Sequence, residues 1–276
     1  MLSATVAAIG LVTPGMENWR EGVGVLRGDI AYGPRPLSKH KLELLPANER
    51  RRATPLIQLA LRAIEDCLSS ATASKAAPAP GYERLASVFA CSGGDMGNLH
   101  ASCEQLAKDP KGVSPTTFHN SVHNAVAGYW SIGGHARATS ISICAHDASF
   151  VAGLLEAFAL LTESAAPVLY VAYDMAVPLP LFNKRPVTPD FAVALLLDPV
   201  REAAREVVTI ESVDHFHTET ATYPIQTVLA HAALETLRLG NPAARALPVL
   251  QLLAGATSGN VLLADDEVCW QVGYAP

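Results

Sequence analysis

The segment Ser140 to Ala157, SISICAHDASFVAGLLEA, places three potential nucleophiles where two patterns meet. It begins with the alternation of a strand and continues with the spacing of a helix, so the chain must turn sharply between them. Cys144, Asp147 and Ser149 lie at this turn. The N-terminus of a helix lowers the pKa of a thiol and offers free N–H groups to an oxyanion, which is chemistry suited to acyl transfer.

A thiol or hydroxyl nucleophile also needs a base within hydrogen-bond reach. His146 adjoins the turn, and His123 lies in a helical pattern that precedes it. One hypothesis is therefore an acyltransferase or thioesterase-like enzyme that uses Cys144, Ser149 or Asp147 with one of these histidines.

A second polar cluster is the segment VDHFHTE at 213–219. If the segment is extended, His215 and His217 share one face, with Asp214 and Glu219 nearby. A metal site usually needs a third ligand at a defined spacing, and none is apparent. We interpret the segment as a polar turn and expect no metal.

The glycine pairs at 93–94 and 133–134 lack the spacing of a dinucleotide or phosphate loop, so we expect no cofactor. The net charge is −6, and Arg50–Arg52 is the largest basic cluster, which argues against nucleic acid as a partner. The N-terminus lacks the pattern of a secretory signal, and no apolar run reaches the ~18 residues of a membrane span. Five cysteines without CxxC spacing indicate reduced thiols, so we expect a cytoplasmic protein.

The elements that must position these residues form an α/β pattern, and half of the 276 residues are hydrophobic, enough for one large core. Strands are predicted at 5–12, 85–94, 139–144, 167–174 and 191–198. Helices are predicted at 55–71, 118–130, 148–163 and 225–239, and the Pro-rich stretch 71–82 is predicted to be a loop.

The segment SPTTFHNSVHNAVAGYWSIGGHARATSISI at 114–143 resembles the N-terminal half of a β-ketoacyl synthase of the thiolase-like fold. IGLVTPG, LPANERRRAT and FAVALLLDP extend the resemblance, in order, over about the first 200 residues. The chain is most similar to the short synthase-like proteins of aryl-polyene clusters, which are related in role to chain-length factors. The resemblance implies an α/β, thiolase-like fold with a single N-terminal-type half at 1–206, a mixed sheet covered by helices. A truncated C-terminal extension at 207–276 is expected to pack on it.

In active members of that family the strand SISI is followed by ATAC, and the cysteine at the tip of the next helix is the nucleophile. An ungapped comparison places Cys144 on the first alanine of this motif and Asp147 on the nucleophile. A three-residue shift that made Cys144 the nucleophile would reverse the strand's buried face and break the helical register of Val151 and Leu154. We therefore expect no catalytic residue here, with Asp147 as a helix N-cap and Cys144 as a small buried filler.

Condensing members of the family also need two histidines in HGTGT-like and lysine-histidine segments, and a GFGG-like loop. None of these motifs is present; SGNVLLA at 258–264 is at most a faint echo of the loop, and His215, His217 and His231 stand in other contexts. Only about 70 residues follow the first half, too few for a second thiolase-like repeat. Condensation by this chain alone is therefore not expected.

The resemblance implies instead a non-catalytic, chain-length-factor-like subunit that pairs with an active β-ketoacyl synthase in fatty-acid or polyketide-type (aryl polyene) biosynthesis. Acyl carrier protein would then be met through the complex. A third hypothesis is a free-standing acyl-binding or structural protein.

The partner interface is expected at the helix 118–130 and the strand 139–144, because the missing second half would leave one apolar face of the sheet uncovered. One face of that helix could line or plug the partner's acyl tunnel, although core packing explains each residue singly as well. The residues of this face are Thr117, Phe118, Ser121, Val122 and Ala125.

Overall fold

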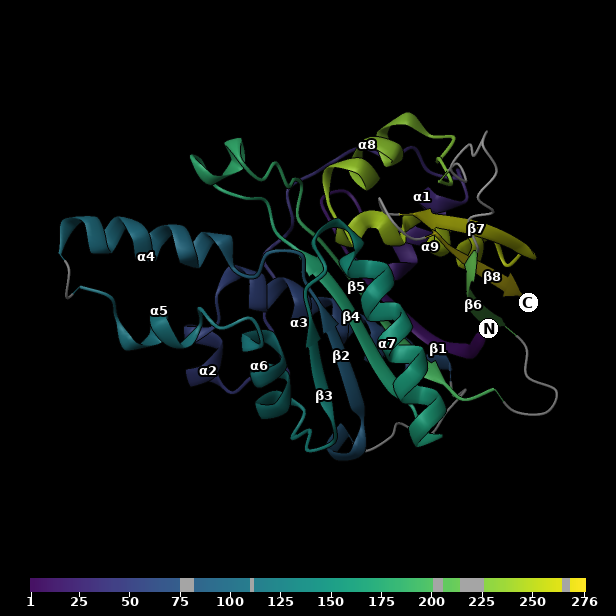
Figure 1. Cartoon of the computed structure of the whole chain (residues 1–276), viewed down its shortest axis with the longest axis horizontal. Helices are drawn as coiled ribbons and strands as arrows, with labels where there is room; N and C mark the ends of the chain where they lie inside the picture. Colours follow the sequence, from purple (N-terminus) through teal and green to yellow (C-terminus); the bar gives the residue numbers. More distant parts are fainter. Residues whose placement is uncertain (75–81, 110–111, 201–205, 214–225, 265–268) are drawn as a thin grey trace, which may run out of the picture.

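Among the residues that the structure describes, eight strands form one mixed sheet in the order β3-β2-β4-β5-β1-β6-β8-β7 (Figure 1). This computed structural model describes residues 1–74, 82–109, 112–200, 206–213, 226–264 and 269–276. The strands are β1 Leu2–Val12, β2 Ala86–Ala90, β3 Ser140–Ile143, β4 Val168–Asp174, β5 Phe191–Asp198, β6 Val207–Val213, β7 Gly259–Ala264 and β8 Cys269–Ala275.

The α-helices are α1 Trp19–Leu26, α2 Ala47–Arg52, α3 Pro55–Ser74, α4 Met96–Lys108, α5 Pro115–His119, α6 Ala125–Gly133, α7 Ser149–Ser164, α8 Ala232–Gly240 and α9 Leu247–Gly255. Short 3-10 turns lie at η1 Tyr82–Arg84, η2 His146–Ala148, η3 Leu181–Asn183 and η4 Ala243–Ala246. All five predicted strands are present, and the α/β, thiolase-like fold class is confirmed.

Strand direction divides the sheet into two parts. β3, β2 and β4 are parallel to one another, whereas β4 with β5, β5 with β1, and β1 with β6 are antiparallel. The parallel strands are joined by helical crossovers, and their carboxyl ends meet at one edge of the sheet. This edge is the usual place for a binding site in an α/β sheet.

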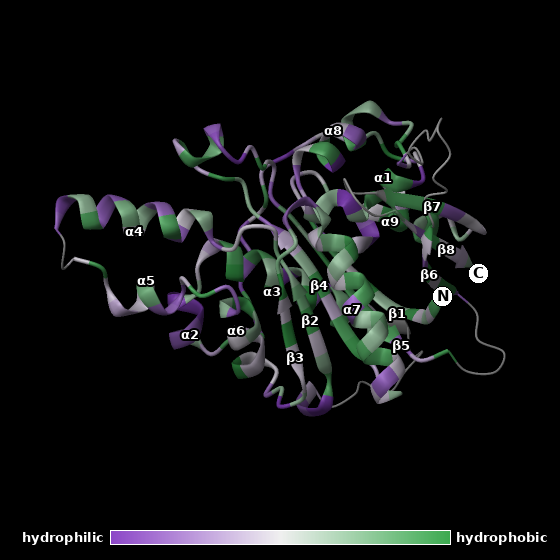
Figure 2. Ribbon diagram, viewed as in Figure 1, coloured by the Kyte–Doolittle hydropathy of each residue, from purple (hydrophilic) through white to green (hydrophobic). Residues whose placement is uncertain are grey.

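Alternate residues of β5 point into two separate cores. Phe191, Val193 and Leu195 pack with α7, while Ala192 and Ala194 pack on the side of α3. The strand is buried on both faces, which explains why it reads as an unbroken apolar run. Figure 2 shows this concentration of hydrophobic residues in the central strands and in α7.

The prediction that one face of the sheet is uncovered is wrong for the part of the chain that the structure describes. α3 and α6 cover one face, and α7 covers the other together with α1, η4 and α9. The C-terminal segment adds β6, β8 and β7 to the same sheet, and its helices continue the layer of α7 (Figure 1). The described residues of this segment therefore add to the core on the α7 side.

Two predicted helices differ from the structure. The helix predicted at 118–130 is split, because α5 ends at His119 and α6 begins at Ala125. Within the break the Ser121 hydroxyl donates to the Phe118 carbonyl, a local bond that competes with the helix. The buried Asn120 amide donates to the Arg52 carbonyl at 2.8 Å.

The helix predicted at 225–239 begins only at Ala232. Thr227 is instead held beside β7, where its N–H donates to the Leu262 carbonyl and its hydroxyl accepts the Leu262 N–H. Tertiary pairing thus overrides the local helical pattern. At the predicted loop 71–82, α3 continues to Ser74, and residues 75–81 lie outside the described part of the chain.

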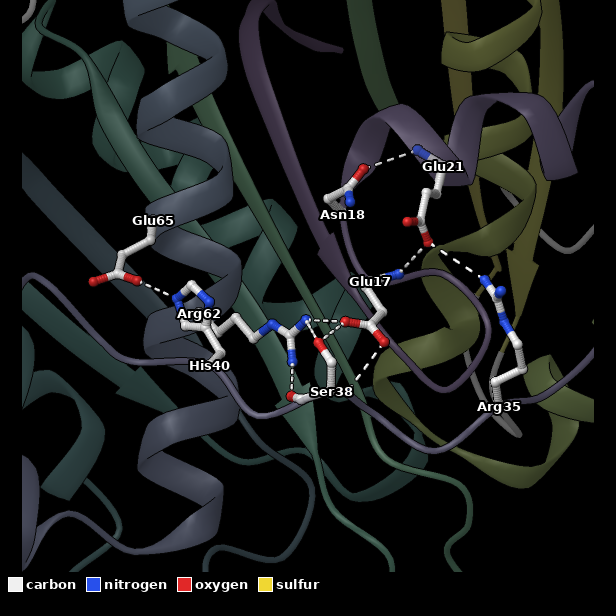
Figure 3. Close-up of polar contacts among 8 residues, drawn as sticks. All are labelled: Glu17, Asn18, Glu21, Arg35, Ser38, His40, Arg62 and Glu65. Atoms are coloured by element: carbon white, nitrogen blue, oxygen red, sulfur yellow. Dashed lines mark hydrogen bonds and ion pairs between the residues drawn. The ribbon is translucent and has the colours of Figure 1, made fainter.

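Residues 30–46 form an irregular strap that crosses α3 (Figure 3). Glu17 accepts the Ser38 N–H at 3.0 Å and forms an ion pair of 2.5 Å with Arg62. His40 contacts Glu65 at 2.6 Å. Leu42 and Leu45 are buried and anchor the strap in the core on the α3 side.

Candidate functional site

The candidate site is the corner between β3 and α7, at the carboxyl ends of the parallel strands. The corner consists of residues 144–149, which include η2. It lies next to the end of β2, because the Cys144 thiol donates to the Ser92 carbonyl at 3.2 Å. His146 has a φ of 49°, the left-handed conformation, which is strained for a residue with a side chain.

An ion pair occupies this corner. The Asp147 Oδ1 and the Arg185 Nη2 atoms are 2.6 Å apart, and the two side chains are 48% and 20% exposed. Partial burial disfavours ionisation, but the Arg185 guanidinium outweighs it and holds the pKa of Asp147 below its usual value. No pattern in the sequence pointed to Arg185, which lies in the irregular segment after η3 and reaches the corner only in the folded chain.

Asp147 was expected to be the N-cap of α7, and this prediction is wrong. Asp147 lies inside η2, the N-cap of α7 is Ala148, and no side chain makes the cap bond. Ser149, the first residue of α7, closes the corner instead. Its hydroxyl accepts the Ala145 N–H at 3.0 Å and donates to the His146 carbonyl at 2.7 Å.

Cys144 was expected to be a buried filler, and this prediction is also wrong, because the residue is exposed. Exposure alone does not make it a nucleophile. Within the described ranges, neither Cys144 nor Ser149 has a hydrogen bond to a histidine ring, and the Ser149 hydroxyl is committed to two backbone partners. His123 contacts the Cys91 carbonyl at 3.3 Å instead. Among the residues that the structure describes, the corner therefore shows no hydrogen bond between a nucleophile and a histidine base.

A buried carboxyl group lies at the end of β4. Asp174 is 4% exposed, and its Oδ1 accepts the Ser92 N–H at 2.9 Å and the Ser92 hydroxyl at 2.7 Å. Burial raises the pKa of Asp174 to about 6 in spite of these bonds. Asp174 was not among the predicted site residues, although a charged residue that ends an apolar strand was a usable signal.

The ionisation of Asp174 makes the free energy of unfolding depend on pH. Its pKa is higher in the folded chain than in the unfolded chain, so its ionisation disfavours the fold as the pH rises through about 6. We expect the free energy of unfolding to increase by about 1 kcal/mol between about pH 7 and about pH 5 from this group alone. Urea unfolding at several pH values measures it.

The matched variant for this measurement is Asp174→Asn, which keeps the acceptor for Ser92 but does not titrate. Its pH dependence between about pH 5 and about pH 7 should be flatter than that of the unaltered chain by the same amount. If the free energy of unfolding changed equally with pH in the two proteins, groups other than Asp174 would be responsible for the pH dependence.

The five residues expected to line a partner's tunnel follow one another along α5, the break after it and the start of α6. Thr117 and Phe118 are on α5, Ser121 and Val122 are in the break, and Ala125 begins α6. Phe118 and Val122 are 71% and 51% exposed. α6 packs against β3, whose outer edge carries no strand among the described residues.

Other predicted features fall outside the site. His215 and His217 lie outside the described residues, and His231 precedes α8 without a side-chain cap bond. In the described ranges, no group of three or more histidine, cysteine or acidic residues could hold a metal ion. No helix in that part of the chain is long and apolar enough to cross a membrane.

A cavity of about 730 Å³ lies beside the strap, and its lining includes Glu17, Glu65, Asp66 and Tyr82. Its acidic groups have internal partners. Glu17 and Glu65 bind Arg62 and His40, and Asp66 accepts the Leu11 and Trp19 N–H groups. These contacts hold the strap on α3, so we assign the cavity a structural role.

Comparison with known proteins gives a family and a set of similar folds. Residues 29–240 match the family model for the β-ketoacyl synthase N-terminal domain. No curated protein sequence matches the chain.

Three solved structures are similar at low identity. A complex of the ketosynthase ApeO with its chain length factor ApeC from Xenorhabdus doucetiae contains a chain that is 22% identical, with coverage of 99% of this chain and 100% of that chain and a TM-score of 0.70. The ishigamide ketosynthase/chain length factor gives 15% identity, 99% coverage of both chains and a TM-score of 0.72. AntDE:AntF, a type II PKS acyl-carrier protein with its ketosynthase, gives 13% identity, coverage of 100% and 99%, and a TM-score of 0.71.

Proposed function

Because this chain belongs to the family of β-ketoacyl synthase N-terminal domains, we propose that it is a ketosynthase-like subunit that pairs with an active β-ketoacyl synthase and does not condense acyl chains itself. More specifically, we propose that the chain acts as a chain-length factor in aryl-polyene biosynthesis and contacts acyl carrier protein through the complex. The similar structures include ketosynthases bound to chain length factors, which supports a paired role.

The observation that carries the proposal is the ion pair at the corner. Family resemblance puts the nucleophile at Asp147, and this carboxylate is bound to Arg185. A carboxylate held at low pKa by a guanidinium is a weak nucleophile and a weak base. At the position that the resemblance gives to the nucleophile, the corner therefore holds an ion-paired carboxylate and not a thiol.

The second support is a set of exposed apolar side chains on α5, in the break after it and on α6, the helix that packs against the edge strand β3. Phe118, Val122 and Ile132 are large apolar residues with 71%, 51% and 44% exposure. An open edge strand beside exposed apolar side chains favours pairing with another chain. We propose that Thr117, Phe118, Ser121, Val122 and Ala125 contact the partner and help to shape its acyl tunnel.

Co-expression with an active β-ketoacyl synthase from the same organism tests the pairing. We expect the untagged synthase to co-purify with the tagged chain through affinity and size-exclusion steps, because obligate interfaces bury more than ~2,000 Å². Recovery of the chain alone at the mass of a monomer would contradict the proposal. In that case binding of an acyl chain to the isolated protein would favour the free-standing acyl-binding alternative.

A second prediction concerns covalent chemistry. Incubation with acyl-loaded carrier protein should leave the mass of this chain unchanged, because the corner holds Asp147 and not a paired thiolate. Intact-mass spectrometry measures the outcome, with the active synthase as the positive control. A stoichiometric acyl adduct on Cys144 would instead support the acyltransferase alternative.

A further inference from the structure

The middle of the strap, residues 33–41, is a surface segment with the sequence GPRPLSKHK. Leu37 is half-buried, and the other eight residues are exposed. Pro34 and Pro36 lack an N–H group, and proline disfavours both a helix and the ladder of a sheet. The segment therefore has little of the burial and backbone pairing that hold a chain in one position.

Charged side chains hold the middle of the strap in place. In the part of the chain that the structure describes, its main chain makes two hydrogen bonds, and both are at Ser38. The Ser38 N–H donates to the Glu17 carboxylate at 3.0 Å, and the Arg62 guanidinium donates to the Ser38 carbonyl at 3.0 Å. Arg62 on α3 also binds Glu17, so one cluster of three residues fixes the segment (Figure 3).

Both ends of this segment are anchored by buried contacts. On one side Tyr32 packs against the core next to α7, and its hydroxyl donates to the Pro14 carbonyl at 2.9 Å. On the other side Leu42 is buried in the core next to α3. At Gly33, beside the first anchor, an added Cβ would meet no atom within 4 Å, and the backbone freedom of glycine suits a hinge. Motion is therefore confined to the residues between the two anchors.

Two cavities adjoin the middle of the strap. The cavity of about 730 Å³ described above is one of them, and the other has a volume of about 480 Å³. His40 of the strap and Arg62 of α3 line both cavities, so these two residues stand between them. Leu59 of α3 lines the smaller cavity and is 5% exposed. If the strap moved away from α3, the two cavities would join into one groove along the helix.

Few contacts oppose such a movement. The segment would lose the bonds of Ser38, the contact of His40 with Glu65 and the partial burial of Leu37. Regions with few buried apolar contacts open locally at a much lower free energy than the whole fold. The core beneath the strap does not depend on residues 33–41, because the buried side chains of the strap lie outside that range, at Leu42 and Leu45.

We propose that the middle of the strap is a hinged lid on α3. Residues 33–41 swing away as a unit between the anchors Tyr32 and Leu42, while the sheet and α3 stay folded. The closed lid keeps ligands and other chains away from this part of α3, and the cluster of Glu17 and Arg62 with the strap holds it closed. The inference goes beyond the proposed function, because it concerns the chain by itself and needs no synthase.

The test measures access to α3 beneath the strap in the full-length chain. Leu59→Cys places a thiol in the smaller cavity, and mass spectrometry of peptides follows its reaction with N-ethylmaleimide under native conditions. Cys67 on the same helix is fully buried and serves as the internal reference, because it reacts only when the core opens. We expect the introduced thiol to react much faster than Cys67, at a rate that low concentrations of urea leave unchanged.

Arg62→Met, added to Leu59→Cys, removes the side chain that holds the lid closed. The rate of labelling at position 59 should rise about tenfold or more, because charge-assisted bonds to the strap are lost, and the rate at Cys67 should not change. Arg35→Met is the matched control. It removes the same charge from the strap itself, but Arg35 is 72% exposed and 3.8 Å from Glu21, so the rate should change less than about twofold.

Two further variants keep the test decisive if a protein does not fold. Without Leu59→Cys, hydrogen exchange at the Ser38 N–H reports the opening, and Arg62→Met should raise its rate about tenfold while exchange in β5 stays unchanged. Without Arg62→Met, Glu17→Gln removes the ion pair but keeps an acceptor for the Ser38 N–H, and should act in the same direction.

Two results would overturn the lid. One is labelling of Leu59→Cys only together with Cys67, which would mean that this part of α3 is reached by unfolding alone. The other is an equal rate at position 59 with and without Arg62→Met, or with and without Glu17→Gln. Both results are obtained on the isolated chain, so they leave the proposed pairing with a synthase untouched.

Discussion

A chain that carries Val122→Asp is expected to lose its ketosynthase partner under conditions in which the unaltered chain retains it. Val122 is 51% exposed and lies in the break between α5 and α6, so the substitution leaves the separate fold intact. In the proposed complex it buries an unpaired carboxylate. We expect binding to weaken by about 3 kcal/mol or more, which is over about a hundredfold in Kd.

Val228→Asp is the matched control for the pull-down. Val228 is 62% exposed, and its neighbour Thr227 pairs with β7, at the opposite edge of the sheet from β3. The same chemical change there should leave the affinity unaltered. Equal binding of the two variants would remove the assigned interface and, with it, the tunnel-shaping role. Ala125→Asp is a poorer test, because Ala125 packs against the core and the carboxylate would also disturb the fold.

The second large effect is expected from a substitution at Gly10 in β1, which should lower the free energy of unfolding. A Cβ atom on Gly10 would lie 2.0 Å from the Ala63 carbonyl oxygen and 2.5 Å from the Cys67 backbone nitrogen, both in α3. Backbone atoms of a packed helix cannot rotate away, so strand and helix must separate. We expect Gly10→Ala to lower the free energy of unfolding by about 3 kcal/mol or more.

Gly128→Ala provides the comparison. It lies in α6, where an added Cβ meets no atom within 4 Å, and helix propensity favours alanine over glycine by about 1 kcal/mol. Urea unfolding followed by circular dichroism should place the two variants on opposite sides of the unaltered chain. A Gly10→Ala protein within about 1 kcal/mol of the unaltered chain would mean that α3 shifts more easily than its contacts indicate.

The sequence was most informative where one local pattern determined the structure. β4 and β5 are continuous apolar runs of strand length, and they were predicted to within one residue of their observed bounds. The corner between β3 and α7 was found from the change of period at Ser149. In both places the residues that set the pattern also make the buried contacts.

Prediction failed where contacts distant in sequence decide the local structure. The break at 120–124 depends on the bond from Asn120 to the Arg52 carbonyl, and the late start of α8 depends on the pairing of Thr227 with β7. The partner of Asp147 comes from a loop whose pattern carries no signal. A helix N-cap was the best local interpretation of Asp147, and a distant arginine overrode it.

The position of β1 in the sheet has a consequence for how the protein is made. β1 precedes β2, β3 and β4 in the chain, yet its two neighbours in the sheet are β5, Phe191–Asp198, and β6, Val207–Val213. Both of its edges therefore stay unpaired until β5 and β6 have been translated, and pairing at such sequence separation is slow. We expect the sheet to close late, after much of the chain has left the ribosome, with the apolar strand β1 dependent on chaperones until then.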